Sequence, residues 1–234
     1  MPIHIARQTL AGVPVLLARP TPAAAPPPIV LWFHGFRADA AANEAELAQL
    51  ADVGFLAVGV DAVGHGVRRA GDIDARIAGA PGGARSVMLE MAAATVAELP
   101  ALLAALADGG LGDPARVAVV GVSMGGYLAY RAALAVPGVR VAVAVLGSPE
   151  WPDDASPHRH PAAFQNLALL SITAERDVNV PPGPARQLHA ALATGHPAPE
   201  RARYLELPGA EHLMTAAQWA AAMDETRRWL SAHL

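Results

Sequence analysis

Short apolar segments rich in β-branched residues alternate along most of this chain with longer segments of helical periodicity. The apolar segments are 29–33, 55–60, 117–120, 139–146 and 167–172, followed by a more mixed one at 203–207. The helical segments are 41–52, 87–107, 124–136, 184–193 and 215–234. Because continuous apolar strands alternating with amphipathic helices bury both faces of a sheet, this pattern predicts an α/β fold with a mostly parallel sheet and helices on both faces.

Two further strands are expected at the beginning of the chain. Residues 3–9 and 13–18 are separated by Ala11 and Gly12, which is the pattern of an antiparallel hairpin. They bring the expected sheet to about eight strands. The Pro-rich stretch 19–28 predicts a stiff surface connection; a linker between domains is disfavoured because fewer than twenty residues precede it. A single domain is therefore expected over residues 1–234.

The composition excludes several classes of protein. Hydrophobic residues make up 53% of the chain and charged residues 16%, which is typical of a compact interior rather than a disordered tail. The net charge of -4 leaves no excess of cations for a phosphate backbone, so nucleic acid is not expected as a partner. The absence of Cys excludes disulfides, thiolate metal sites and thiol nucleophiles.

Neither export nor a membrane partner is predicted. The first ten residues lack the charged and apolar regions of a secretory signal, so a cytoplasmic location is expected. No run approaches the roughly 18 consecutive apolar residues that a membrane helix needs.

The strongest chemical signal is the sequence GVSMGG at 121–126, directly after an expected strand and directly before an expected helix. This is the G-x-S-x-G nucleophile elbow, in which a sharp turn exposes the Ser side chain. Gly121 and Gly125 leave room for the strand and helix to approach, and the helix N-terminus favours negative charge developing at Ser123. The alternative interpretation is an ordinary Gly-rich junction between a strand and a helix.

A second motif, HGF at 34–36, ends another apolar strand. Acyl transfer needs two N–H donors aimed at the oxyanion, and we expect them to be the backbone N–H groups of Met124 and Phe36. His34 is a conceivable base. We favour a structural role for it, in which it forms hydrogen bonds with nearby loops.

A general base and an acid are expected later in the chain, in the order Ser, acid, His. His212, after the last strand, would take the Ser proton, and Asp177, after the strand at 167–172, would orient the imidazole. Glu175 is a competing acid in the same loop. Asp153 and Asp154 occupy the other loop in which such folds can place the acid.

The remaining histidines have simpler explanations. His65 lies in a Gly-rich loop, where a hydrogen bond that braces the loop is expected. His158 and His160 are a weak metal signal, because two His separated by one residue lack a confirmed carboxylate partner. No metal and no cofactor are predicted.

At these motifs the chain resembles the α/β-hydrolase superfamily, specifically its compact bacterial carboxylesterases, which are similar to the catalytic domains of prolyl-oligopeptidase-type enzymes. The resemblance extends from residue 29 to the C-terminus and rests on HGF at 34–36, DAVGHG at 61–66, DPARV at 113–117 leading into GVSMGG, Asp177 with VP at 180–181, and GAEH at 209–212. It implies Ser123 as nucleophile, Asp177 as acid, His212 as base, and Phe36 and Met124 as oxyanion donors.

One departure from these relatives concerns the cap. Many of them insert a helical cap between the strands at 139–146 and 167–172, but only about twenty residues join these strands here, which predicts a minimal or absent cap and an open site. Phe36, Trp151 and Leu213 are candidate apolar walls, although simple packing of its loop is an equal alternative for Trp151. The segment 67–86 could instead fold over the opening.

These features predict a serine carboxylesterase that hydrolyses small or short-acyl esters through an acyl-enzyme, with a small-molecule ester as substrate and a monomeric or homodimeric state. A peptidase or thioesterase of the same fold is the alternative, and a non-catalytic binding protein of this fold is less favoured. Haloalkane dehalogenation and epoxide opening need a carboxylate at position 123, and dienelactone hydrolysis needs a thiol, so these activities are disfavoured.

Overall fold

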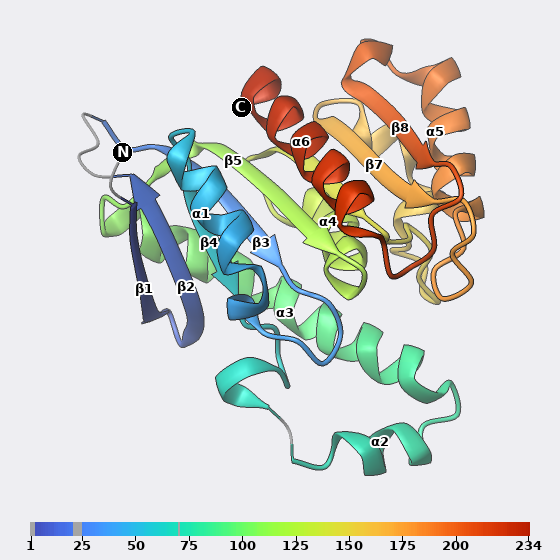
Figure 1. The fold of residues 1–234 in the computed structure, drawn as a ribbon, viewed down its shortest axis with the longest axis horizontal. Helices are drawn as coiled ribbons and strands as arrows, with labels where there is room; N and C mark the ends of the chain where they lie inside the picture. Colours follow the sequence, from blue (N-terminus) through green and yellow to red (C-terminus); the bar gives the residue numbers. More distant parts are fainter. Residues whose placement is uncertain (1–2, 21–24, 70) are drawn as a thin grey trace.

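The computed structural model describes residues 3–20, 25–69 and 71–234, and within them it contains one eight-stranded sheet (Figure 1). The strand order is β1-β2-β4-β3-β5-β6-β7-β8. The strands are β1 (Ile3–Leu10), β2 (Val13–Pro20), β3 (Pro28–Phe33), β4 (Leu56–Val60), β5 (Asp113–Val122), β6 (Val139–Val145), β7 (Ala168–Ala174) and β8 (Ala202–Leu207). The predicted sheet of about eight strands is therefore confirmed.

The first two strands form the expected antiparallel hairpin. Ala11 and Gly12 both have positive φ, 47° and 79°, as a two-residue turn of type I′ requires. β2 then pairs antiparallel with β4, whereas all later neighbours pair in parallel. The sheet is thus mostly parallel. The predicted Pro-rich connection at 19–28 includes residues 21–24, which lie outside the described residues.

Helices cover both faces of the sheet, as the alternating pattern predicts. Helices α1 (Glu44–Asp52) and α6 (Ala216–His233) lie on one face, and α3 (Gly83–Asp108), α4 (Met124–Ala135) and α5 (Gly183–Gly195) on the other (Figure 1). Each face has its own apolar core, because alternate residues of a strand point to opposite sides. The carboxyl ends of the parallel strands consequently meet at one edge, where ligands of such sheets bind.

Two features of the connections bear on the site. The stretch between β6 and β7 contains only two short 3-10 helices, at Pro157–Arg159 and Pro161–Phe164, so the prediction of a minimal cap is confirmed for this fully described stretch. By contrast, the helix α2 (Ile73–Gly79) was not predicted. It lies apart from the sheet, below α3 in Figure 1.

Helix α3 is long and apolar enough to cross a membrane, with a mean hydropathy of 1.6 over its best window. That window is 56% buried within the protein, where α3 contributes Leu99, Leu102 and Leu106 to the core beneath the sheet. Central helices of folded domains have the same length and composition. Helix α3 is accordingly a core element of this domain.

Candidate active site

The turn between β5 and α4 carries Ser123 in a strained conformation. Ser123 has φ 56° and ψ -114°, a region that residues other than Gly rarely occupy. A Cβ atom added to Gly121 would lie 1.9 Å from the carbonyl oxygen of Gly125, and one added to Gly125 would lie 2.0 Å from that of Phe33. The two glycines therefore allow the close approach of strand and helix that the motif predicted.

A continuous chain of hydrogen bonds joins Ser123, His212 and Asp177. Ser123 Oγ lies 2.9 Å from His212 Nε2, and His212 Nδ1 lies 2.7 Å from Asp177 Oδ2. Asp177 is an acceptor here, so Nδ1 carries the proton and Nε2 is free to accept from the Ser hydroxyl. Three side chains that are far apart in the sequence thus form one hydrogen-bonded unit at the carboxyl edge of the sheet.

The carboxylate of Asp177 is itself held in place. Its side chain has no exposed surface, and Oδ1 accepts hydrogen bonds from the backbone N–H groups of Asn179 at 2.9 Å and Val180 at 2.8 Å. These bonds orient Oδ2 toward His212. They also supply hydrogen-bond donors to a carboxylate whose burial would otherwise be costly.

The competing carboxylates have other partners. Glu175 accepts from the backbone N–H of Gly209 at 2.6 Å, and so ties the loop after β7 to the loop after β8. Asp153 and Asp154 pair with Arg131 and Arg159. Among the candidates, only Asp177 contacts His212 in the described residues.

The two expected oxyanion donors, Met124 and Phe36, belong to the two turns that meet at Ser123. Met124 is the first residue of α4, where backbone N–H groups have no partner within the helix. The HGF turn approaches from β3, since a Cβ atom added to Gly35 would lie 3.9 Å from Ser123 Cβ. Phe36 is the next residue in that turn, and its ring packs against His65 with centroids 5.3 Å apart.

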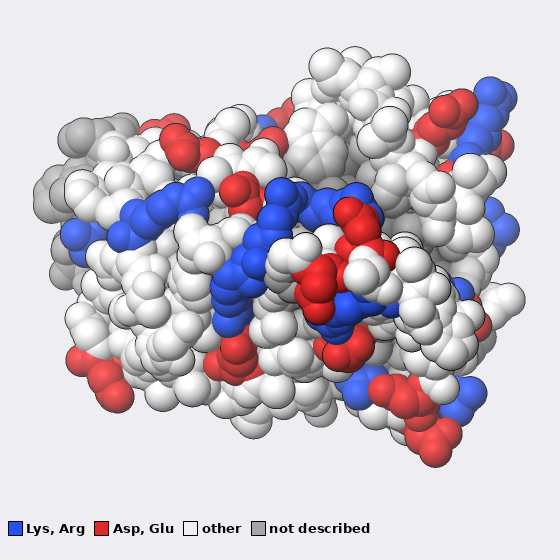
Figure 2. Space-filling model, turned by 90° about the horizontal axis from the view of Figure 1, so that it is seen from below, with Lys and Arg blue, Asp and Glu red and all other residues white. Residues whose placement is uncertain are grey.

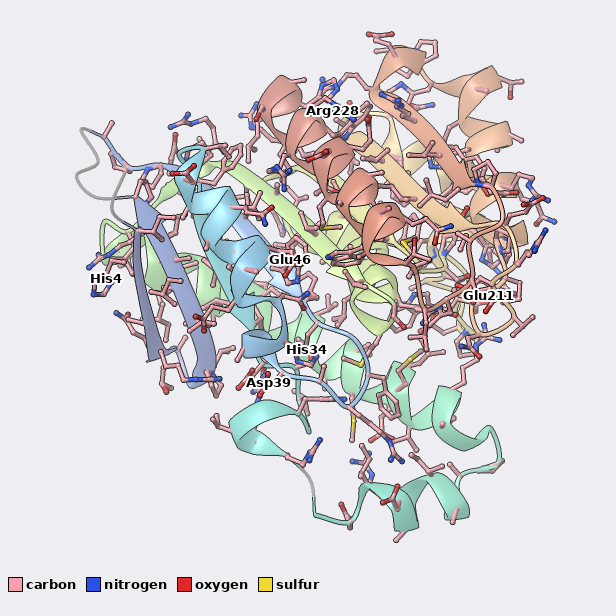
Figure 3. All side chains as sticks on the ribbon, viewed as in Figure 1. His4, His34, Asp39, Glu46, Glu211 and Arg228 are labelled. Carbon is pink, nitrogen blue, oxygen red and sulfur yellow. The ribbon has the colours of Figure 1, made fainter. Side chains whose placement is uncertain are left out.

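His34 and His65 brace loops, as predicted. His34 Nδ1 lies 2.8 Å from the carbonyl oxygen of Gly35, and its Nε2 accepts from the N–H of Ala62 at 3.1 Å. His65 Nδ1 bonds the carbonyl oxygen of Val63. Burial lowers the pKa of both imidazoles, because it disfavours the charged form. Figure 3 shows His34 where β3 ends, and Glu211, beside His212, in the loop after β8.

The three candidate walls differ in their surroundings. Phe36 is half-buried, Trp151 is only 3% exposed, and Leu213 is 88% exposed. The Trp151 ring packs against Arg131, whose guanidinium carbon is 4.8 Å from the ring centroid, and edge-on against Tyr127. Packing within its own surroundings therefore explains these contacts of the Trp151 ring. Trp151 also lines a cavity.

The segment 67–86 borders this edge of the sheet through side-chain contacts. Asp74 forms an ion pair with Arg37, which follows Phe36, and Arg69 donates to the Arg37 carbonyl oxygen at 3.0 Å. At its other end Arg85 pairs with Glu150 at 3.9 Å. Figure 2, seen from below, shows positive and negative side chains intermixed on this face of the molecule. No role was predicted from the sequence for Arg85, Glu150 or Tyr127. Of the three, only Glu150 carried a signal in the sequence, since it follows closely after the end of a strand.

Within residues 3–20, 25–69 and 71–234, no three His, Asp or Glu side chains are grouped as they would be to hold a metal ion. His158 bonds Ser156 Oγ at 2.7 Å, and His160 bonds the carbonyl oxygen of Asp154 at 2.7 Å. The two histidines whose spacing gave a weak metal signal thus each have a local partner.

Comparison with known proteins defines the family. A model described as "Dienelactone hydrolase family" matches residues 13–229. The chain belongs to the dienelactone hydrolase family. This family is part of the α/β-hydrolase superfamily, so the resemblance stated from the motifs is confirmed. Dienelactone hydrolysis itself was disfavoured because it uses a thiol, and in this family member the elbow residue is Ser123 and the chain contains no Cys.

Individual relatives agree with this fold. The "Esterase YjfP" of Escherichia coli (strain K12) is 30% identical over 147 residues, which are 62% of this chain and 56% of that esterase; the match spans little more than half of the curated relative. Among solved structures, TT1662 from Thermus thermophilus has a TM-score of 0.76 at 23% identity, covering 98% of this chain and 99% of the other. A puromycin-hydrolyzing peptidase of Mycobacterium tuberculosis has a TM-score of 0.72 at 21% identity, covering 99% of this chain and 39% of the peptidase. At these identities the structures establish the fold.

Proposed function

We propose that this member of the dienelactone hydrolase family is a serine carboxylesterase that hydrolyses small or short-acyl esters through an acyl-enzyme. The observation that carries the proposal is the hydrogen-bonded chain from Ser123 through His212 to Asp177. A nucleophile within reach of a base, with the base oriented by a third group, is the arrangement that activates a hydroxyl for acyl transfer.

Acylation would begin with proton transfer from Ser123 Oγ to His212 Nε2, while Oγ attacks the acyl carbon. Asp177 would hold the imidazole in the required tautomer and stabilise the imidazolium. The strained backbone of Ser123 supports this role, because it fixes the hydroxyl at the end of the sheet before substrate arrives. The imidazolium would then protonate the oxygen of the leaving alcohol, which leaves the acyl group on Ser123.

The tetrahedral intermediate would place its negative oxygen between the backbone N–H groups of Phe36 and Met124. Each such donor contributes on the order of 3 kcal/mol to transition-state stabilisation. The N-terminus of α4 adds a favourable dipole. In deacylation, His212 would activate a water molecule by the same path, and Ser123 would be released with its proton restored.

A fluorophosphonate probe and two chromogenic esters test this proposal. We expect the probe to label the wild-type protein at Ser123 and not the Ser123→Ala variant, and we expect hydrolysis of 4-nitrophenyl acetate and butyrate by the wild type alone. Failure of the probe to label the wild type would favour the non-catalytic binding protein. If the probe labels Ser123 but neither ester is hydrolysed, the proposed esterase activity is wrong, whereas the assignment of Ser123 as the nucleophile is correct.

A peptidase is the second candidate, since the puromycin-hydrolyzing peptidase has the same fold over its matching part. The two functions are separated by comparing an acyl 4-nitrophenyl ester with the 4-nitroanilide of the same acyl group. An esterase should hydrolyse the ester far faster. Comparable kcat/KM values for the two would favour the peptidase, and preference for a matched thioester would favour a thioesterase.

We further propose the substrate, the partners, the location and the oligomeric state of the protein. The substrate is a small-molecule ester, nucleic acid and membranes are not partners, no metal or cofactor takes part, and the protein acts in the cytoplasm as a monomer or homodimer. Full activity after dialysis against EDTA and a size-exclusion profile with light scattering would test the cofactor and the oligomeric state.

A further inference from the structure

A cavity of about 350 Å³ lies between the first turns of α3 and the loop that follows β6. It is lined by Gly82, Arg85, Ser86, Leu89, Glu150, Trp151 and Pro152. This volume is within the range of pockets that bind small molecules. The cavity is therefore large enough to receive part of a substrate.

The interior and the mouth of this cavity differ in chemistry. Leu89 and Trp151 are 6% and 3% exposed and supply apolar surface at its base. Arg85 and Glu150 face each other at 3.9 Å, and about half of each side chain is exposed, so the pair stands at the solvent side. The methylene groups of both side chains extend the apolar wall, while the two charges balance one another.

The cavity adjoins the reacting residues through Tyr127. The N–H of Tyr127 bonds the carbonyl oxygen of Ser123 at 3.2 Å, and its ring meets Trp151 edge-on. Burial raises the pKa of the Tyr127 hydroxyl, which bonds Ser148 and is within electrostatic reach of Asp177 as well as of the Arg85–Glu150 pair. Tyr127 therefore joins Trp151 of the cavity lining to the helical turn that begins at Ser123.

The backbones of the two elements also touch. A Cβ atom added to Gly126 would lie 2.6 Å from Gly147 Cα, so the loop that carries Glu150 and Trp151 starts directly beside the first turn of α4. The N–H of Ser123 bonds the carbonyl oxygen of Val145, the last residue of β6. The loop after β6, which supplies Glu150, Trp151 and Pro152 to the cavity, thus begins against the nucleophile turn.

We propose that this cavity receives the acyl group of an uncharged substrate, and that the Arg85–Glu150 pair at its mouth determines which acyl groups enter. The inference rests on the proposed esterase function. An apolar acyl chain gains from burial against Leu89 and Trp151, because this burial removes its methylene groups from water. A carboxylated acyl group gains from Arg85 but is repelled by Glu150, so it has no advantage over its apolar counterpart.

The size of the pocket is tested by filling it at an exposed position. Ser86→Phe places a ring in the cavity without altering the buried core, and Ala104→Phe, at an exposed position of the same helix outside the cavity, is the matched control. We expect Ser86→Phe to lower the ratio of kcat/KM for 4-nitrophenyl hexanoate over acetate by about tenfold or more, and Ala104→Phe to leave the ratio unchanged. Equal changes in both variants, or no change in Ser86→Phe, would overturn the proposal.

The charge selectivity is tested with two substrates of similar length, 4-nitrophenyl pentanoate and the 4-nitrophenyl monoester of glutaric acid. We expect pentanoate to be preferred by the wild type, and we expect Arg85→Met, which leaves Glu150 unopposed, to increase that preference; an unchanged ratio would show that the pair does not select the acyl group. A preference for the glutarate ester that disappears in Arg85→Met would show that the mouth selects acidic acyl groups, and would overturn the proposal. Hydrolysis of the acetate and probe labelling at Ser123 report on the esterase function separately, so the two failures are distinguishable.

Discussion

The turn that carries Ser123 and the segment 71–86, which includes α2, are held in place by different means. Around Ser123, backbone atoms of β3, β5 and α4 are so close that a single added methyl group would overlap a carbonyl oxygen. The segment is joined to its surroundings by ion pairs of partly exposed side chains, Arg37 with Asp74 and Arg85 with Glu150. Close packing tolerates little change, whereas exposed pairs contribute little free energy.

This contrast separates chemistry from selectivity. The groups proposed to perform the reaction stand on strand ends and on loops fixed by buried hydrogen bonds. Among the groups proposed to admit the acyl chain, Arg85 stands on the segment whose contacts can be exchanged without disturbing the sheet, and its partner Glu150 stands on the loop after β6. Substitutions at the first set should abolish activity, and substitutions at the second should change which substrates are used.

The largest effect is expected from the acid. Asp177→Asn should lower kcat by about 10⁴-fold, because the amide would favour the wrong imidazole tautomer. Glu175→Gln, the matched control in the same loop, should change kcat by less than about threefold, since its contact is with a backbone N–H. Steady-state hydrolysis of 4-nitrophenyl acetate measures both. Similar losses in the two variants would place the acid elsewhere.

The next largest effect concerns packing at the turn. Gly121→Ala should destabilise the protein by about 3 kcal/mol or more, since the new methyl group meets the Gly125 carbonyl oxygen. Gly79→Ala, at the end of α2 where the space is open, should be neutral or raise stability by up to about 1 kcal/mol. Urea unfolding measures both free energies. A tolerated Gly121→Ala would show that the turn is less tightly packed than its geometry indicates.

An acid-dependent loss of stability is expected from His189, which lies far along the chain from Ser123 and bonds Ser171 Oγ at 2.7 Å. Burial lowers the pKa of His189 to about 4 in the folded protein, against 6.5 as its ordinary value. As the pH falls, His189 is therefore protonated in the unfolded chain before it is protonated in the folded protein. The free energy of unfolding should be at its full value above about pH 6.5 and should decrease by on the order of 3 kcal/mol as the pH approaches 4.

Unfolding curves between pH 4 and 7 test this, with His189→Gln as the comparison. The variant should be less stable at pH 7 and should have a flatter pH dependence below 6.5. His34 and His65, whose pKa values are also lowered by burial, change in the same direction and leave a residual slope. An unchanged slope in the variant would contradict the assignment.

The smallest effect on stability is expected in the segment 71–86. Asp74→Asn removes the partner of Arg37 and should cost about 0.2–1 kcal/mol, because both side chains are more than half exposed. Its stability should approach that of the wild type at high salt, where the pair is screened. Thermal unfolding at two ionic strengths measures this. A loss as large as that of Gly121→Ala would show that the segment is integral to the core.

The sequence by itself determined the alternation of strands and helices, the elbow glycines and the order of Ser123, Asp177 and His212. These follow from local patterns: apolar periodicity, a turn that only Gly permits, and residues placed just after strand ends. The cores on both faces of the sheet formed where that periodicity indicated, and the turn at Ala11 and Gly12 adopted the conformation that a short hairpin requires.

Only the tertiary structure decided which carboxylate meets His212, where the segment around α2 folds, and that a cavity forms between α3 and the loop after β6. The sequence favoured Asp177 over Glu175, which is two residues earlier and nearer the strand end, but it left both open. In the structure Asp177 accepts from two backbone N–H groups and contacts the imidazole, whereas Glu175 accepts from the N–H of Gly209. Helix α2 is short and buries no residue, so its position depends on ion pairs with distant residues, which no local pattern records.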